Sequence, residues 1–372
     1  MHIDEAVILT QDRLAEEGGT MADLLGRFRS KVSSVLIGER EWGRILERAN
    51  QLPITMGAQP FGFELPLHDS RPAADFGVSL SSGNRSGDYF EERVRTDEAD
   101  ETAGAVKRLF REMEAQNSPL REIVGRKLML EYDIGSAQGS RNALPGMFLR
   151  PNERTLFGGG GLQDDVGIVV DALVSCVGWE KNAAESKMAK EVYLAQPEDT
   201  RLDSFGVFPS RERTVRLAIM GLNAQEGVCS FLENTGWPGH VTAVDSVISR
   251  FRERADIVSA GVNVDVRADG LGPTLGITPI VKQRYTQESR YWIDGMTDWD
   301  PVLDALGYGD FVVPEKLAAL ADWASKPETL FARTGPFVLL RGIHHLKLVI
   351  TGNKLEQVKA YLYMVLSGAL SN

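Results

Sequence analysis

The chain has little cysteine, no long apolar run and no excess of positive charge, and each absence excludes a class of protein. Among its 372 residues only Cys176 and Cys229 are cysteines, and neither lies in a Cys-x-x-Cys motif. A disulfide framework is therefore excluded, and a reducing compartment is expected. No segment approaches the roughly 18 consecutive apolar residues that a membrane helix needs. The first residues also lack the regions of a secretory signal, so we expect a cytoplasmic protein.

Positive charge is also scarce. Lysine and arginine together number 41 against 52 acidic residues, which gives a formal net charge of −11. This balance argues against a broad surface for nucleic acid or anionic membranes, although it allows a local basic pocket. The apolar fraction of 43% and the charged fraction of 25% fit a globular protein with ample core.

Two phosphate-associated motifs are missing. The glycine run at 158–161 lacks the Gly-Lys-Ser/Thr ending of a P-loop and the spacing of a dinucleotide-binding loop, so we interpret it as a flexible connector. Asp164-Asp165 lacks the third acid of an Asp-Asp-x-x-Asp motif. An all-helical prenyl or terpene synthase is therefore disfavoured.

What the sequence does contain is a two-faced hairpin near its C-terminal end, in the segments 342–350 and 359–364. Both segments alternate apolar and polar residues, which is the side-chain period of a β-strand. We expect His344 on the apolar face and His345 on the polar face, so these adjacent histidines are not expected to bind one metal ion together. The other face carries cations, an imidazole and phenols: His345, Lys347, Lys359, Tyr361 and Tyr363.

A similar pattern, two helical segments followed by two alternating segments, occurs five times along the chain. A charged stretch at 87–101 is expected to be partly mobile. The expected helical regions are 4–51, 103–116 with 118–125, 162–177 with 183–194, 224–234 with 241–254, and 300–306 with 315–324. The expected strand pairs are 61–68 with 75–81, 127–134 with 146–150, 204–208 with 214–220, 261–266 with 274–282, and 342–350 with 359–364.

Every expected strand has one apolar face, which amphipathic helices must cover. Ten antiparallel strands with a strong twist tend to close, because closure removes their edges. The predicted fold is therefore α+β: one domain, 1–372, in which helices surround a ten-stranded antiparallel β-barrel with a polar lumen. A (β/α)₈ barrel is disfavoured because its strands are parallel. The polar face carries Glu64, Asp75, Glu131, Asp133, Arg216, Asn263, Asp265, Lys282, His345, Lys347, Lys359 and Tyr361.

This arrangement resembles the ABBA, or PT-barrel, prenyltransferases, which are built from helix-strand-strand-helix repeats around a ten-stranded antiparallel barrel. The resemblance is one of pattern over nearly the whole chain, and Lys359-Ala360-Tyr361 is similar to the Lys-x-Tyr pairs of the indole-type branch. It implies that inward-facing side chains hold the diphosphate of a prenyl donor. The residues at such positions are Arg216, Asn263, Lys282, Lys347, Lys359, Tyr361 and Tyr363.

The resemblance also implies a reaction, in which an allylic diphosphate ionises and an aromatic acceptor, such as an indole, or a peptide attacks the cation. Fixed cations would stabilise the leaving diphosphate. Tyr361, Tyr363 and Phe148 would shield the carbocation, since cation–π attraction is worth about 0.5 to 2 kcal/mol per ring. Glu64 is the candidate that orients and deprotonates the acceptor.

Two departures from the family pattern leave alternatives open. The strand at 146–150 lacks the Lys-x-Tyr pair, and several acids share the inward face. Either Mg²⁺ bridges acids such as Asp133 and Asp265 to the diphosphate, or the acids pair with inward lysines and arginine. The alternative functions are a non-prenylating PT-barrel that binds an anionic or amphipathic ligand, and a barrel enzyme that uses its carboxylates for other chemistry.

Overall fold

The computed structural model describes residues 3–134, 144–152, 155–158, 160–224, 226–255, 257–281, 299–309, 311–323 and 327–368. In these residues each predicted pair of strands forms, and one sheet of 11 strands results. The strands are β1 Phe61–Pro66, β2 Asp75–Ser81, β3 Lys127–Tyr132, β4 Gly146–Leu149, β5 Arg201–Val207, β6 Val215–Asn223, β7 Ile257–Arg267, β8 Gly270–Val281, β9 Glu328–Ala332, β10 Gly335–Thr351 and β11 Lys354–Ser367.

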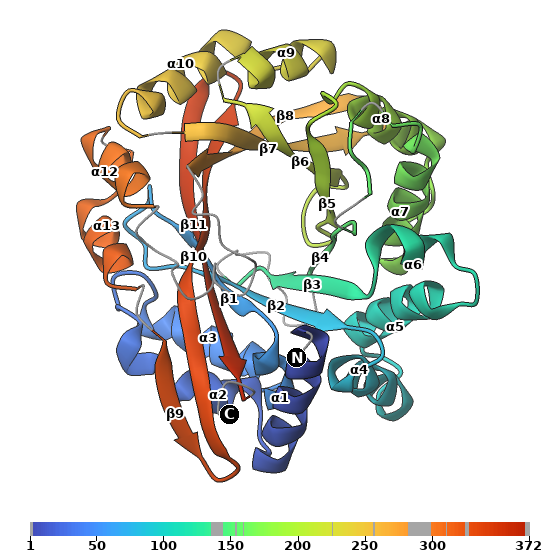
Figure 1. The fold of residues 1–372 in the computed structure, drawn as a ribbon, viewed down its shortest axis with the longest axis vertical. Coiled ribbons are helices and arrows are strands. Elements are labelled where there is room, and N and C mark those ends of the chain that lie inside the picture. The colour runs from blue at the N-terminus through green and yellow to red at the C-terminus, as the bar shows by residue number, and fades with distance from the viewer. Residues whose placement is uncertain are drawn as a thin grey trace.

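The sheet closes on itself. Its order runs β11-β1-β2-β3-β4-β5-β6-β7-β8-β10, and β10 pairs back with β11, while β9 pairs only with β10. All of these pairings are antiparallel. The predicted ten-stranded antiparallel barrel is therefore confirmed, and Figure 1 shows it end-on, with the helices in a ring outside it.

The outer layer consists of helices from every predicted unit. They are α1 Ile3–Glu17, α2 Met21–Gly26, α3 Glu39–Ala49, α4 Arg85–Thr96, α5 Glu101–Glu114, α6 Pro119–Val124, α7 Gln163–Cys176, α8 Ala183–Leu194, α9 Glu226–Asn234, α10 Val241–Arg252, α12 Asp300–Tyr308 and α13 Pro314–Ala321, with short 3₁₀ turns at Arg29–Lys31 and Ile54–Ala58. Among the described helices, none combines the length and the apolarity needed to span a bilayer.

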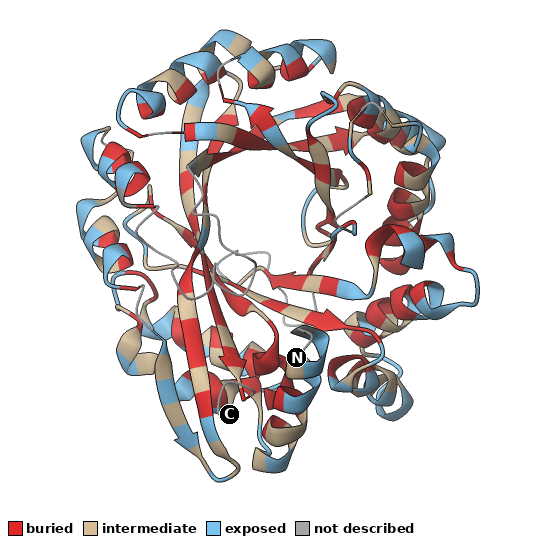
Figure 2. Cartoon of the chain, viewed as in Figure 1, coloured by how far each residue is buried: buried red, intermediate tan, exposed pale blue. Residues whose placement is uncertain are grey.

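The hydrophobic core is the shell between the barrel and these helices. On β1, Phe61, Phe63 and Leu65 are each at most 2% exposed, as alternation predicts for one face of a strand. The Phe63 ring lies 5.9 Å from that of Trp42 on α3 and 6.3 Å from that of Trp323 beyond α13. Burying a side chain of this size contributes about 1.5 to 3 kcal/mol. Figure 2 shows the same pattern around the molecule, with buried residues on the strands and on the helix faces turned toward them.

Two elements differ from the sequence-based expectation. The stretch expected to be partly mobile, 87–101, includes most of α4, Arg85–Thr96, so residues 87–96 are helical instead. Asn84 caps this helix by accepting a hydrogen bond from the Ser86 amide, and Phe90 packs into the core with 3% exposure. The strand β9 was not expected, and it extends the β10–β11 hairpin beyond the closed ring.

Candidate active site

Three adjacent strands bring four predicted site residues together on the inner face of the barrel. Glu64 on β1 lies opposite Tyr361 on β11, and Lys347 on β10 lies opposite Lys359 on β11. The Lys359 ammonium donates to Glu64 Oε1 at 2.5 Å, and the Lys347 ammonium donates to the Tyr361 hydroxyl at 3.0 Å. The predicted catalytic carboxylate and part of the predicted diphosphate site are therefore one hydrogen-bonded group.

Glu64 is ionised in this environment. Burial alone would raise the pKa of its carboxyl, but the positive charges of Lys359 and Lys347, with hydrogen bonds from Lys359 and Tyr361, lower that pKa to about 2. Burial lowers the pKa of the Lys359 ammonium, and the stronger attraction of Glu64 raises it above its ordinary value. This lysine and this glutamate therefore form a charged pair at neutral pH.

Lys347 differs because its ammonium contacts a phenol rather than a carboxylate. Burial lowers the pKa of this lysine to about 8, and the neighbouring Arg216 and Lys359 charges act in the same direction. The Tyr361 phenol stays protonated because burial and the charge of Glu64 raise its pKa well above the ordinary value. The Lys347 ammonium also lies 4.6 Å from the centre of the Tyr361 ring. Among the described residues no carboxylate lies in contact with this ammonium, so an anion that enters here meets a cation paired only with a phenol.

Across the barrel, Arg216 on β6 makes a two-pronged pair with Asp265 on β7, with Nε–Oδ1 and Nη2–Oδ2 distances of 2.8 and 3.0 Å. Asn263, on the same face of β7, lies opposite Gly276 on β8. A Cβ atom at Gly276 would lie 3.1 Å from Lys347 Cδ and 3.3 Å from Asn263 Oδ1. The glycine therefore leaves the space in which Lys347 and Asn263 come together.

The two remaining predicted diphosphate residues are Tyr363 and Lys282. Tyr363 lies opposite Gly62 on one side and Gly342 on the other, and it is 3% exposed. A Cβ at Gly342 would approach the Tyr363 hydroxyl to 2.9 Å, so this phenol lies over the glycine. Lys282 lies outside the described residues.

Sequence reasoning missed Arg211, which lies in the turn between β5 and β6. Its guanidinium donates from Nε to Asp133 Oδ2 at 3.0 Å and from Nη2 to the other carboxylate oxygen, and the Ser210 hydroxyl donates to Asp133 at 2.6 Å. The same guanidinium lies 3.6 Å from Glu131 Oε1. A usable signal was present, since an arginine-rich turn between two strands with inward polar faces can fold back over the barrel mouth.

An aromatic wall lies beside these cations. The Phe148 ring on β4 meets the Phe208 ring just after β5 edge-on, with centres 5.0 Å apart. The guanidinium carbons of Arg211 and Arg216 lie 4.1 and 4.8 Å from the centre of the Phe208 ring. The shielding role predicted for Phe148 stays a prediction, and Phe208, which packs against it, was not singled out from the sequence.

The closed ten-strand ring with its outer helices agrees with solved structures. The prenyltransferase PriB in its apo form superposes with a TM-score of 0.51 and 13% identity, over 97% of this chain and 96% of PriB. The chain has the PT-barrel fold. The 5-dimethylallyltryptophan synthase from Streptomyces coelicolor is also similar, with a TM-score of 0.48 and 13% identity over 92% of this chain and 97% of that one. No protein-family model and no curated protein matches the sequence.

The two aspartates predicted as Mg²⁺ ligands in this PT-barrel are each held by an arginine. Asp133 accepts from Arg211, and Asp265 accepts from Arg216 on a different pair of strands. In the described part of the chain, no group of three or more histidine, cysteine or acidic side chains could hold a metal ion. The donor oxygens of these two residues therefore do not fit a shared magnesium site, and the ion pairs are the arrangement that the structure presents.

The two adjacent histidines, His344 and His345, do not point to opposite faces of their strand as expected. A bulge in β10 between Ile343 and His345 interrupts the alternation of faces. As a result His344 and His345 lie side by side, with their Nδ1 atoms 2.7 Å apart, and His345 stacks on Tyr361 at 4.0 Å. The expectation that the two imidazoles point to opposite faces is therefore wrong. His344 is an exposed residue rather than one packed on an apolar face.

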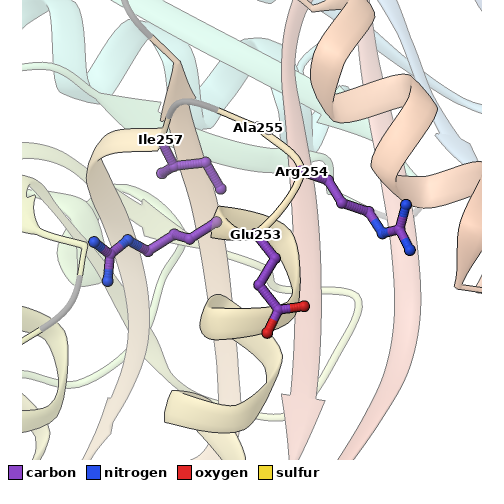
Figure 3. Close-up of a pocket in the computed structure, with 5 residues that line it drawn as sticks. Glu253, Arg254, Ala255 and Ile257 are labelled. Atoms are coloured by element: carbon purple, nitrogen blue, oxygen red, sulfur yellow. The ribbon is translucent and has the colours of Figure 1, made fainter.

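A separate cavity of about 370 Å³ lies where α10 leads into β7 and is lined by Arg252, Glu253, Arg254, Ala255 and Ile257. Figure 3 shows that the charged side chains of Glu253 and Arg254 point in different directions there. None of the predicted site residues lines this cavity. The predicted site residues lie instead on the inner face of the barrel.

Proposed function

We propose that this protein transfers a prenyl group from an allylic diphosphate to an aromatic acceptor inside the barrel. The observation that carries the proposal is the environment of Lys347. Among the hydrogen bonds described for it, this half-buried side chain contacts only a phenol, and its Cδ lies close to Gly276. Arg216 and Lys359 lie near enough to act on its charge. Such a group suits a ligand with several negative oxygens, such as a diphosphate.

The residues have distinct roles in this proposal. Lys347, Arg216 and Lys359 stabilise the negative charge that grows on the leaving diphosphate, and Tyr361 donates a hydrogen bond beside them. Phe148 and Phe208 cover the allylic cation and keep water from it. Glu64, already ionised, accepts the proton that the aromatic ring releases when its new carbon–carbon bond forms. The proton and the diphosphate then leave as separate products.

The test combines turnover with donor binding. The protein is incubated with dimethylallyl or geranyl diphosphate and a panel of aromatic and peptide acceptors, with and without Mg²⁺, and diphosphate release is measured. We expect release with an aromatic acceptor and its loss in Lys347→Ala. A thiolodiphosphate analogue at 100 times its dissociation constant should add about 2.7 kcal/mol to the free energy of unfolding. If neither diphosphate changes the melting temperature and no release occurs, the donor assignment is wrong.

A second function is favoured by the ion pairs on the inner face. Glu64 with Lys359, Asp133 with Arg211 and Asp265 with Arg216 already neutralise much of the charge there. That balance suits a PT-barrel that binds an anionic or amphipathic ligand without transferring a prenyl group. Stabilisation by the diphosphate and by its thiolo analogue, without diphosphate release for any acceptor, would favour this alternative.

A further inference from the structure

The strand β9 presents an open sheet edge outside the closed ring. Among the described residues it pairs only with β10, from Ala332 opposite Gly335 to Glu328 opposite Leu339. Figure 1 shows β9 on the outside of the molecule, with β10 on one side and no other described strand on the other. An open edge can pair with a strand of another chain, and proteins commonly guard it with proline, lysine or a bulge. The described pairing of β9 has no register shift, and residues 328–332 include neither proline nor lysine.

The two faces of β9 differ in their surroundings. On the outer face the Phe331 side chain is 84% exposed, the highest value among the exposed large apolar side chains of the described residues. On the inner face Leu330 packs against the core, and Glu328 lies 3.1 Å from the Arg341 guanidinium and also contacts the Lys31 ammonium. The strand is therefore held in place, and pairing its edge with another strand would order little additional chain.

The backbone groups that are open at this edge belong to Thr329 and Phe331. Phe331 lies opposite Pro336, which has no N–H and whose carbonyl oxygen accepts from Arg13 Nη2 at 2.8 Å. This pair is therefore of the kind that exchanges no hydrogen bonds, and Thr329 is in the same position against Val338, because the two kinds of pair alternate along antiparallel strands. The N–H and C=O of both residues are consequently directed away from β10, and no backbone partner for them lies among the described residues.

These open positions match a second copy of the same strand. Two copies of β9 that pair antiparallel about a two-fold axis place one residue opposite itself. A register centred on Phe331 would need the Arg333 amide, which already donates to a carboxylate on α1 at 3.2 Å, and one centred on Thr329 would need an N–H from Pro327. A register centred on Leu330 places Thr329 of each copy opposite Phe331 of the other, and each of these pairs can exchange both of its hydrogen bonds.

We propose that β9 is a dimer interface, at which two copies of this chain join their β9 edges antiparallel about Leu330 and form one continuous sheet. In this register Glu328 and Arg333 each lie opposite an uncharged residue of the other copy, so like charges do not face each other. The two Leu330 side chains lie side by side across the axis, and the exposed Phe331 ring gains a neighbour in Thr329 of the other copy. The edge thus matches itself in spacing and in charge.

Sedimentation velocity of the full chain tests the association. A strand edge this short gives an interface at the small, transient end of the range, so we expect a reversible dimer that forms between about 1 and 100 μM. Phe331→Pro removes an open N–H but no hydrogen bond to β10, so it should stay monomeric at these concentrations and keep the urea midpoint of the unmodified monomer. Tyr308→Ala is the matched control, because it removes a 72% exposed aromatic side chain on α12 and should leave the dimer intact.

The register is tested by cysteine cross-linking. In the proposed pairing the two Leu330 residues have a Cα separation of about 4.5 Å, so Leu330→Cys should form an intermolecular disulfide on oxidation. Phe331→Cys is the control, since its two copies lie diagonally across the axis at about 7 to 8 Å, beyond the reach of a disulfide. The unmodified protein, with its own Cys176 and Cys229, gives the background.

Monomers at every concentration would overturn the inference, and so would a dimer that survives Phe331→Pro. Cross-linking of Phe331→Cys in preference to Leu330→Cys would contradict the register on which the inference is built. A monomeric protein that binds an extended peptide, and loses this binding in Phe331→Pro, would show that the edge takes a different chain, which also excludes the second copy. None of these results depends on prenyl transfer, because β9 lies outside the ring that carries Glu64 and Lys347.

Discussion

Lys347 and Lys359 lie opposite each other on the β10–β11 hairpin, yet their partners give them different tasks. Lys359 is held by Glu64, whereas Lys347 is held by the neutral Tyr361 hydroxyl. Removing a charge that has a buried opposite partner destabilises the fold, in addition to any effect on a ligand, whereas the described hydrogen bond of Lys347 is to a neutral group. Mutations of the two lysines should therefore separate stability from binding.

Lys359→Met should destabilise the protein, because it leaves the buried Glu64 carboxylate without its closest cation. Removing one partner of a buried ion pair costs about 3 to 5 kcal/mol, whereas replacing both is often close to neutral. We therefore expect Glu64→Gln combined with Lys359→Met to recover most of the loss in urea unfolding. If the double variant is as unstable as the single one, the two side chains do not act as a pair.

The same pair predicts a pH dependence with a definite sign. The pKa of Glu64 is lowered in the folded protein from 4.5 to about 2, so its ionised form is the one that folding favours. This contribution to stability is complete above pH 4.5 and is lost as the pH falls toward 2. Urea midpoints measured across this range should fall more steeply for the unmodified protein than for Glu64→Gln.

For Lys347 the pH dependence of folding stability has the opposite sign. Its pKa is lowered from 10.5 to about 8, so keeping it charged in the folded protein has a cost that is present below pH 8 and disappears as the pH rises to 10.5. Lys347→Met should therefore stabilise the free protein at pH 7, on the order of 1 to 3 kcal/mol. The urea midpoint checks this, and a lower midpoint for Lys347→Met would show that its charge is satisfied.

Binding of the donor should follow the charge on Lys347. Above pH 8 this lysine loses its proton in the free protein, so the affinity for dimethylallyl thiolodiphosphate should fall, by at most tenfold per pH unit. Lys347→Arg keeps its charge at high pH and should flatten that dependence. Calorimetry without acceptor at pH 7 and pH 9 measures both, and identical profiles for Lys and Arg would exclude Lys347 from the donor site.

At the scale of elements, simple alternation was a good guide where strands are regular. It correctly placed Glu64, Lys347, Lys359 and Tyr361 on one face, whereas α8 was predicted at its observed bounds from its helical pattern. It failed at His344, because a bulge inserts this residue between Ile343 and His345, and no residue type in this stretch indicates a bulge. Alternation could not find Arg211 either, since a turn residue has no periodic face and its position depends on the closed barrel.

The sequence could not predict which acidic side chains of the inner face are ionised. Which acid keeps its proton depends on distances among side chains from several strands, and the difference between Glu64 and Glu131 arises from which of them Lys359 reaches. The sequence could show that acids and bases share a face. Only the register of neighbouring strands decides how they pair.

Glycines on the inner face provide a test of packing at this scale. An added Cβ atom at Gly206 would lie 2.5 Å from the Phe148 ring, so Gly206→Ala should cost about 1 to 3 kcal/mol by overpacking. Gly77→Ala is the matched control, since its Cβ would have only contacts at 3.7 Å or more, and its stability should change by less than about 0.5 kcal/mol. Phe148→Leu should relieve part of the Gly206→Ala loss in chemical unfolding, and the absence of relief would contradict the stated clash.

At the scale of the whole molecule, closure joins the two ends of the chain. The last strand, β11, pairs with both β10 and the first strand, β1, so the ring depends on its final segment. Figure 1 shows α1 near the C-terminal end of β11 and the N-terminal part of β10. Closure removes exposed strand edges. Separating β1 from β11, the seam of the ring, would therefore expose two strand edges at once. The contacts across the seam should therefore influence the stability of the entire barrel.

Arg13 on α1 makes the contacts that test this idea. Its guanidinium donates to the carbonyl oxygens of Gly368, Thr334 and Pro336 at 2.5, 3.0 and 2.8 Å and lies 4.4 Å from the centre of the Phe337 ring. Arg13→Met removes these charged hydrogen bonds, and because one such bond contributes about 1.5 to 3 kcal/mol, we expect a loss of at least that size. Arg40→Met, at an exposed position of α3, is the control and should be close to neutral.

If the seam belongs to one cooperative unit, Arg13→Met should lower the urea midpoint without changing the slope of the transition. Unfolding followed by far-ultraviolet circular dichroism and by tryptophan fluorescence should then coincide, as they do for a two-state transition. An early separate transition in only one of the two signals would show that the seam opens locally while the rest of the barrel stays folded. In that case the terminal elements would be a detachable layer, and the closed ring would depend on its strand pairings alone.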